Sequence, residues 1–133
     1  MLRIVLIIIA AGYAATGAVA LAAPETFYHF TPGVPLTGPF NTHFLRDVGL
    51  ALMVSGAALG WGAVSGAQNL MIAGAGWPTA HAVYHLLIWI DRGCAPDGVA
   101  LFDFAAVIAP AAIAMGIALV SPPGPYEGSA ARV

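Results

Sequence analysis

Long stretches without charge constrain this chain more than any other feature of its sequence. Between Arg3 and Glu25 no side chain is charged, and over all 133 residues only 8% are charged while 60% are hydrophobic. Soluble domains carry about 25% charged residues, and disorder requires low hydrophobicity. The composition therefore excludes a soluble globule and a disordered chain. It indicates an integral membrane protein.

Four apolar stretches are long enough to cross a hydrocarbon core, which takes about 20 helical residues. We expect helices over residues 4–23, 43–64, 70–90 and 99–120, because backbone groups in lipid must be hydrogen-bonded internally. The expected fold class is all-α, a single membrane domain over 1–133 that forms a four-helix transmembrane bundle. The connection 24–42 is expected to be an outer loop, and 121–133 a flexible tail rich in proline and glycine.

The first stretch has two interpretations. Arg3, the apolar run after it and the Ala-Leu-Ala sequence at 20–22 resemble a secretory signal with a cleavage site. The run is longer than the roughly 7–15 residues usual for a signal, which favours a retained first helix. The arginine count ties, with Arg3 and Arg132 on one side and Arg46 and Arg92 on the other. The arginine close to the N-terminus then favours a cytoplasmic N-terminus. With four spans the C-terminus is also cytoplasmic, and the long loop lies outside.

Polar side chains of the third predicted helix fall on one face. His81 and His85 are four residues apart, so they share a face of the helix. Trp77 and Trp89 extend the same stripe by one turn in each direction. This stripe belongs to the outer half of the bundle.

The second predicted helix begins with a similar pair. His43 and Asp47 are also four residues apart, and Arg46 precedes the aspartate. Asn41 or Thr42 is a candidate N-cap. Asp103 lies one turn inside the fourth helix. At about 1.5 Å per residue these groups have similar depths, so neighbouring helices would bring together His43, Asp47, His81, His85 and Asp103.

Several chemistries fit this layer. Imidazole and carboxylate groups bind copper, zinc or iron, which predicts a metal site made of His43, Asp47, His81 and His85, supported by Asn41, Arg46 and Asp103. Ionisable groups in spans also pair with one another. His43 with Asp47, or His85 with Asp103, would then fix the helix register. A proton relay, b-type haem ligation or contact with a lipid or quinone headgroup is the third interpretation.

These motifs resemble a known family. Pro-x-x-Phe-Tyr at 24–28, Asn-x-His-x-x-Arg-Asp-x-Gly at 41–49 and His-x-x-x-His at 81–85 are similar to an uncharacterised bacterial family of small four-helix membrane proteins, broadly DoxX-like. The resemblance covers about residues 24–90 and implies a four-helix protein of the bacterial inner (plasma) membrane. It implies no reaction. The positions that match the family's pattern are Asn41, His43, Arg46, Asp47, His81 and His85.

The leading hypothesis is a small accessory or binding subunit with an outer-leaflet His/Asp site for a metal ion or a proton. A membrane redox enzyme that binds haem or quinone is one alternative, and a purely structural subunit of a larger membrane complex is another. The expected partners are membrane lipids and subunits of such a complex. No basic face for nucleic acid is present. Phosphate-binding glycine loops, GxSxG and HExxH motifs are absent, so no enzyme class is indicated.

Overall fold

The computed structural model describes residues 1–122, and this part of the chain is built from helices without a strand. The long helices are α1 (Leu2–Ala22), α3 (Thr42–Ser65) and α4 (Gln68–Asp91). A fourth helical run consists of α5 (Gly98–Phe102), the π-helical segment η2 (Asp103–Ile108) and α6 (Ala109–Val120). The predicted all-α class is confirmed, and the four predicted helices are present close to their expected ends.

The connection between α1 and α3 differs from the expected loop over 24–42. It contains a short helix, α2 (Pro24–Phe30), and a 3₁₀ helix, η1 (Val34–Thr37). Each has a proline in its first two positions, where the missing N–H costs nothing and the fixed φ favours a helical start. The predicted tail lies outside the described residues, except for its first two positions.

Three helices are long and apolar enough to cross a membrane: α1, α3 and the run Gly98–Val120. The remaining predicted span, α4, has the same length as α3 but does not belong to this group. It is less apolar because it carries two histidines, a threonine and the amide side chains of its first turn.

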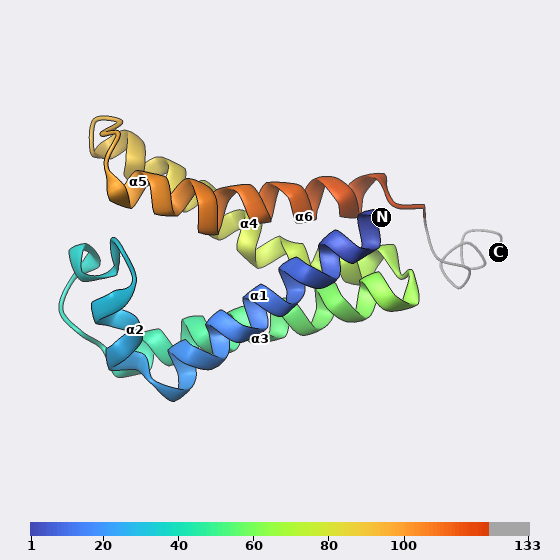
Figure 1. The fold of residues 1–133 in the computed structure, drawn as a ribbon, viewed down its shortest axis with the longest axis horizontal. Coiled ribbons are helices and arrows are strands. Elements are labelled where there is room, and N and C mark those ends of the chain that lie inside the picture. Colours follow the sequence, from blue (N-terminus) through green and yellow to red (C-terminus); the bar gives the residue numbers. More distant parts are fainter. Residues whose placement is uncertain (123–133) are drawn as a thin grey trace.

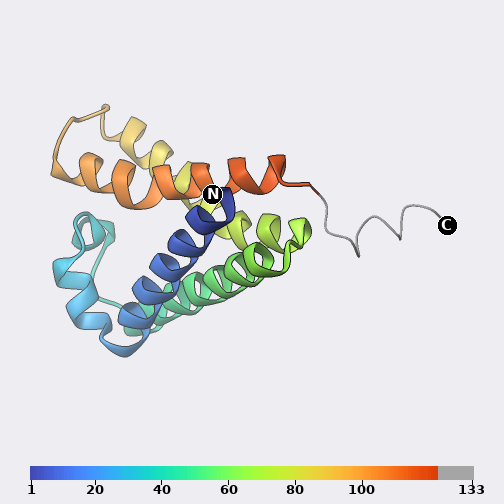
Figure 2. The same ribbon diagram turned by 45° about the vertical axis from the view of Figure 1, so that its right-hand side comes forward.

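The long helices run between two ends of the molecule (Figure 1). We call the end with the segments 23–41 and 92–97 the loop end, and the end with the N-terminus and the turn 66–67 the turn end. α1 packs along α3, α3 along α4, and α4 along η2 and α6. Seen from two directions, the α1–α3 pair and the pair formed by α4 with the α5–α6 run diverge toward the loop end (Figures 1 and 2).

Glycines bring the helices into backbone contact. A Cβ atom built on Gly17 would lie 2.5 Å from the carbonyl oxygen of Gly49, and one on Gly74 only 2.3 Å from the backbone nitrogen of Leu59. α1 and α3, and α3 and α4, therefore approach more closely than any side chain would permit. Small residues at helix contacts are typical of helices that associate in lipid.

The hydrophobic core lies toward the turn end. It contains the fully buried Leu6, Leu59 and Met71, together with alanines of α6. There the side-chain amide of Gln68 donates hydrogen bonds to the carbonyl oxygens of Ala118 and Leu119, at 3.1 and 3.2 Å. This end of the bundle is tightly packed, whereas the loop end contributes no side chain to the core cluster.

Candidate functional site

Both His–Asp pairs suggested by the sequence are present, in opposite surroundings. Nδ1 of His43 lies 2.8 Å from Oδ2 of Asp47, with the side chains 87% and 60% exposed. Nδ1 of His85 lies 3.0 Å from Oδ1 of Asp103, with the side chains only 22% and 6% exposed. The first pair lies within one helix, and the second joins α4 to η2.

Asp103 is the only buried charged residue in the part of the chain that the structure describes. Its contact with Nδ1 of His85 has the distance of an ion pair but lacks the alignment of a hydrogen bond, so the buried nitrogen has no hydrogen-bond partner. Buried carboxylates are costly unless they are paired. The imidazole of His85 lies at ion-pair distance from this carboxylate and would compensate its charge when protonated.

A local change of helix type accompanies the placement of Asp103. Pro110 has no N–H to donate to the carbonyl of Ala106, and its ring would clash with that carbonyl in a regular α-helix. The backbone hydrogen bonds before Pro110 are instead π-helical: the N–H of Ala109 donates to the carbonyl oxygen of Phe104, five residues earlier. A π segment turns the residues before it about the helix axis relative to those after it. Asp103, the first residue of η2, is thereby turned toward α4.

The aromatic stripe of α4 is present for three of its four predicted members. The rings of Trp77 and His81 are stacked, with centroids 4.8 Å apart, and those of His81 and His85 meet at 4.6 Å. Trp89 instead packs edge-on against Phe104, with ring centroids 5.2 Å apart. The buried pair is thus continued toward the turn end by a second imidazole and an indole.

The start of α3 carries the remaining predicted residues. Asn41 is the N-cap, because its Oδ1 accepts a hydrogen bond of 3.1 Å from the N–H of Phe44. His43, Arg46 and Asp47 all lie exposed on the first turns of the helix. This group is local to one helix end and contributes nothing to the buried pair.

The predicted metal ligands are not brought into one site. Within residues 1–122, no three His, Cys, Asp or Glu side chains lie together in an arrangement that could hold a metal ion. The four ligands expected from the sequence form two separate groups: the exposed pair His43 with Asp47 on α3, and His81 with His85 on α4, whose rings meet edge-on.

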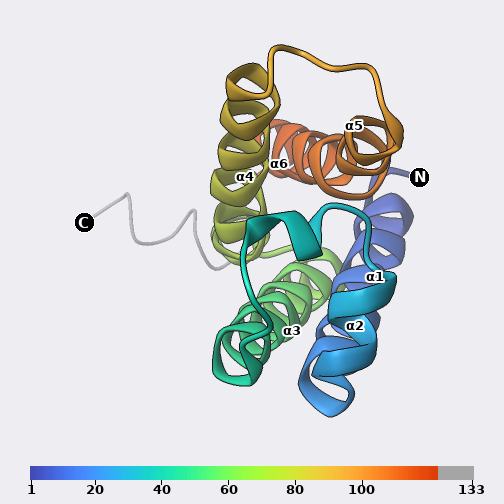
Figure 3. The same cartoon turned by 90° about the vertical axis from the view of Figure 1, so that its left-hand side faces the viewer.

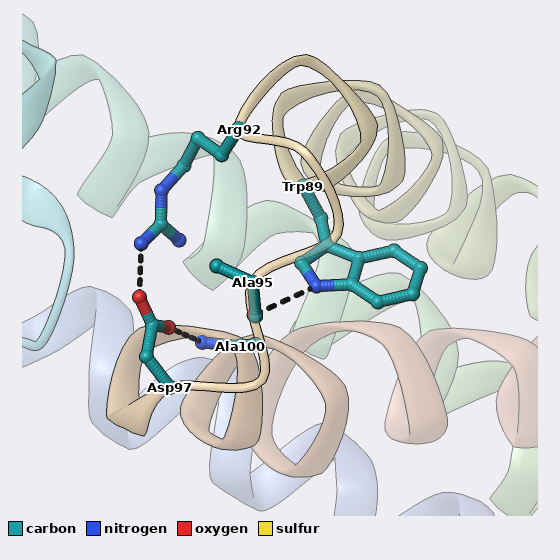
Figure 4. A network of polar contacts seen from close by, with 5 residues as sticks. All are labelled: Trp89, Arg92, Ala95, Asp97 and Ala100. Carbon is teal, nitrogen blue, oxygen red and sulfur yellow. Dashed lines mark hydrogen bonds and ion pairs between the residues drawn. The ribbon is translucent and has the colours of Figure 1, made fainter.

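A polar network in the connection from α4 to α5 was missed by the sequence analysis (Figure 4). Arg92 forms an ion pair with Asp97, whose Oδ1 accepts a hydrogen bond of 2.9 Å from the N–H of Ala100. The indole N–H of Trp89 donates to the carbonyl oxygen of Ala95 at 3.0 Å. An Asp-Gly sequence before an apolar run is a signal for an N-cap, and it could have located this start of the helix.

The same network lowers the pKa of Asp97 below its ordinary value of 3.8. The main cause is the hydrogen bond from the backbone N–H of Ala100, and the guanidinium of Arg92 adds to it. Asp97 therefore stays ionised and caps α5 at neutral pH.

The buried pair has the chemistry to hold a proton. An imidazole and a carboxylate 3.0 Å apart carry no net charge when the histidine is protonated and one negative charge when it is not. The ring of His81 lies in contact with that of His85, so a second imidazole adjoins the pair. No protein-family model matches the chain, and no curated protein or solved structure matches it.

Proposed function

We propose that this chain is an integral membrane protein of four spanning helices in which the His85–Asp103 pair binds a proton. It acts as an accessory or binding subunit in the bacterial inner membrane, with both termini cytoplasmic. The observation that carries the proposal is a carboxylate only 6% exposed, held 3.0 Å from an imidazole of a neighbouring helix. Ionisable groups inside membrane helices are costly, face the bundle interior and serve functions that need them.

Outward-facing apolar side chains support the membrane location. Val54, Trp61 and Leu101 are 68%, 70% and 73% exposed, and each lies on one of the three helices that are long and apolar enough to cross a membrane. Such surfaces are unfavourable in water but suit lipid. α4 packs between α3 and α6 and runs between the same two ends of the molecule, which supports a fourth span (Figure 1).

Arg3 is the basis of the proposed orientation. It lies close to the N-terminus at the turn end, whereas Arg46 and Arg92 lie at the loop end. A cytoplasmic N-terminus puts the loop end, and with it the buried pair, on the outer side. The topology is the one that the resemblance to the DoxX-like family implies.

The surroundings of the pair favour a proton over a metal ion. A metal site requires at least a third protein ligand in reach, and no such group of side chains is formed within residues 1–122. A proton requires only the imidazole and the carboxylate, and its loss changes the charge of a site that is largely shielded from water. Such a change of charge alters the local electrostatic energy more than at an exposed site.

The experiment is a histidine titration with the exposed pair as the matched control. Protein with ¹⁵N-labelled histidine in detergent micelles is followed by NMR from about pH 5 to 8, where histidine ordinarily titrates. If the pair binds a proton, Asp103→Asn changes the ring ¹⁵N shifts of His85. Asp47→Asn is expected to change those of His43 and to leave His85 unchanged.

Two outcomes would overturn the proposal. A single protonation state of His85 throughout the range would mean that the pair only fixes helix register. Stoichiometric metal in protein purified without chelator, lost in both His81→Ala and His85→Ala, would replace the proton by a metal ion. Pigment analysis of the same preparation tests for b-type haem.

A further inference from the structure

We propose that the segment 31–41, held in place by Tyr28, is a cap that limits access to the His85–Asp103 pair from the loop end. The purpose of such a cap rests on the proposed function, because a proton must reach the pair. The geometry of the cap and its effect on access do not depend on what the pair binds.

Tyr28 ties the segment to α2. Its hydroxyl donates a hydrogen bond of 2.8 Å to the carbonyl oxygen of Gly38, ten residues further along the chain. Its ring also packs edge-on against Phe40, with centroids 5.5 Å apart. One half-buried side chain therefore fixes the far side of the segment to the helix from which it starts.

Gly33 brings the segment against the helix that carries Asp103. A Cβ atom on Gly33 would lie 2.9 Å from Cγ1 of Val99, and its φ of +89° favours glycine. Val99 and Asp103 are four residues apart in one continuous helical run, so they lie on the same face. The backbone at Gly33 thus rests one turn beyond the buried carboxylate, toward the loop end.

The segment bridges the two diverging helix pairs. α2 packs against α1 and α3, and the contact at Val99 reaches the opposite pair. Viewed from the loop end, α2 lies in front of α1, and the segment that follows it lies between the two helix pairs (Figure 3). Because the tight core lies at the turn end, this bridge covers the part of the bundle where the helices pack least.

Side-chain modification measures access directly. Diethyl pyrocarbonate acylates neutral imidazole nitrogen, and mass spectrometry compares the rate at His85, 22% exposed, with that at His43, 87% exposed, in the same molecules. The variants are Tyr28→Phe, which removes one hydroxyl, and Gly33→Val, which cannot keep the contact with Val99. Thr26→Val, on the exposed side of α2, is the control.

We expect Tyr28→Phe to raise the modification rate of His85 relative to that of His43 by about two- to tenfold. This range corresponds to the loss of one hydrogen bond. Gly33→Val is expected to raise it at least as much, and Thr26→Val to leave it unchanged. An unchanged ratio in Tyr28→Phe overturns the cap, and this variant decides the question if Gly33→Val does not fold. The two proposals fail separately. The NMR titration reports the protonation of His85 in each variant, and the ratio of rates, compared at a pH where that protonation is the same, reports its access.

Discussion

Oδ1 of Asp103 lies 3.0 Å from Nδ1 of His85 across the contact between η2 and α4, and both side chains are largely buried. The exposed pair of His43 and Asp47 has nearly the same separation, 2.8 Å. The two pairs share residue types and distance but differ in burial and in whether they join two helices. The chain therefore contains its own control for the energetic and chemical effects of burial.

Removal of one partner should affect the two pairs very differently. Asp103→Ala removes one partner of the buried pair, and loss of one partner costs up to about 3–5 kcal/mol in comparable pairs. Asp47→Ala breaks an exposed pair within one helix, worth about 0.3–0.5 kcal/mol. The measurement is the free energy of unfolding in mixed micelles. An equal decrease in the free energy of unfolding in the two variants would contradict the expectation that burial makes the His85–Asp103 pair the more important one for stability.

Replacement of both buried partners separates stability from function. The double variant His85→Leu with Asp103→Leu is expected to fold with a free energy of unfolding within about 1–2 kcal/mol of the wild type, since apolar groups often replace a buried ion pair without loss. It should lose the titration that the NMR experiment assigns to His85. If the double variant fails to fold while Asp103→Asn folds, the pair is needed for the fold itself.

Pro110 should control the contact between Asp103 and His85. Pro110→Ala restores an N–H that can bond to the carbonyl of Ala106, so we expect η2 to become α-helical. A π-helical turn contains about one residue more than an α-helical turn. The change to an α-helix would therefore rotate Asp103 by about 100° about the helix axis relative to α6. The coupling energy between Asp103 and His85, from a double-mutant cycle, should then fall toward zero. Pro78→Ala is the matched control and should leave it intact.

The glycines offer a test of the helix contacts. Gly17→Ala and Gly74→Ala place a methyl group 2.5 and 2.3 Å from backbone atoms of α3, so both helices must move apart. Overpacking of this kind costs about 1–3 kcal/mol. Gly12→Ala and Gly76→Ala, where nothing lies within 4 Å, should instead stabilise by about 0.5–1 kcal/mol. Thermal unfolding of the four variants should divide them into these two classes.

Asp97 should make stability depend on pH in the acidic range. Its pKa is lower in the folded chain than its ordinary value of 3.8, chiefly because the N–H of Ala100 hydrogen-bonds to the carboxylate. The unfolded chain thus binds the proton first as the pH falls, so the contribution of Asp97 is present above about pH 4 and lost below it. Asp97→Asn keeps a capping oxygen but cannot titrate. The difference in stability between wild type and variant should shrink below pH 4, and a constant difference would contradict this assignment.

The sequence predicted the local parts of the fold well. Apolar runs bounded by polar and glycine residues located the four long helices, and Asn41 before α3 was found as its N-cap. The connection 24–42 differs from the prediction, because its prolines begin α2 and η1 and do not mark a loop. Proline fits the first turn of a helix as well as a turn. Composition does not separate the two.

The sequence alone determined what depends on neighbours along one helix: the helical class, the pairing of His43 with Asp47, and the shared face of Trp77, His81 and His85. A helical repeat fixes these relations whatever surrounds the helix. The tertiary structure decided that His85 meets Asp103, that the predicted metal ligands stay apart, and that Gly33 lies against Val99. These relations depend on how the helices are rotated and spaced. That geometry is set by glycine contacts between helices and by the π-helical segment before Pro110, which act only once the helices pack.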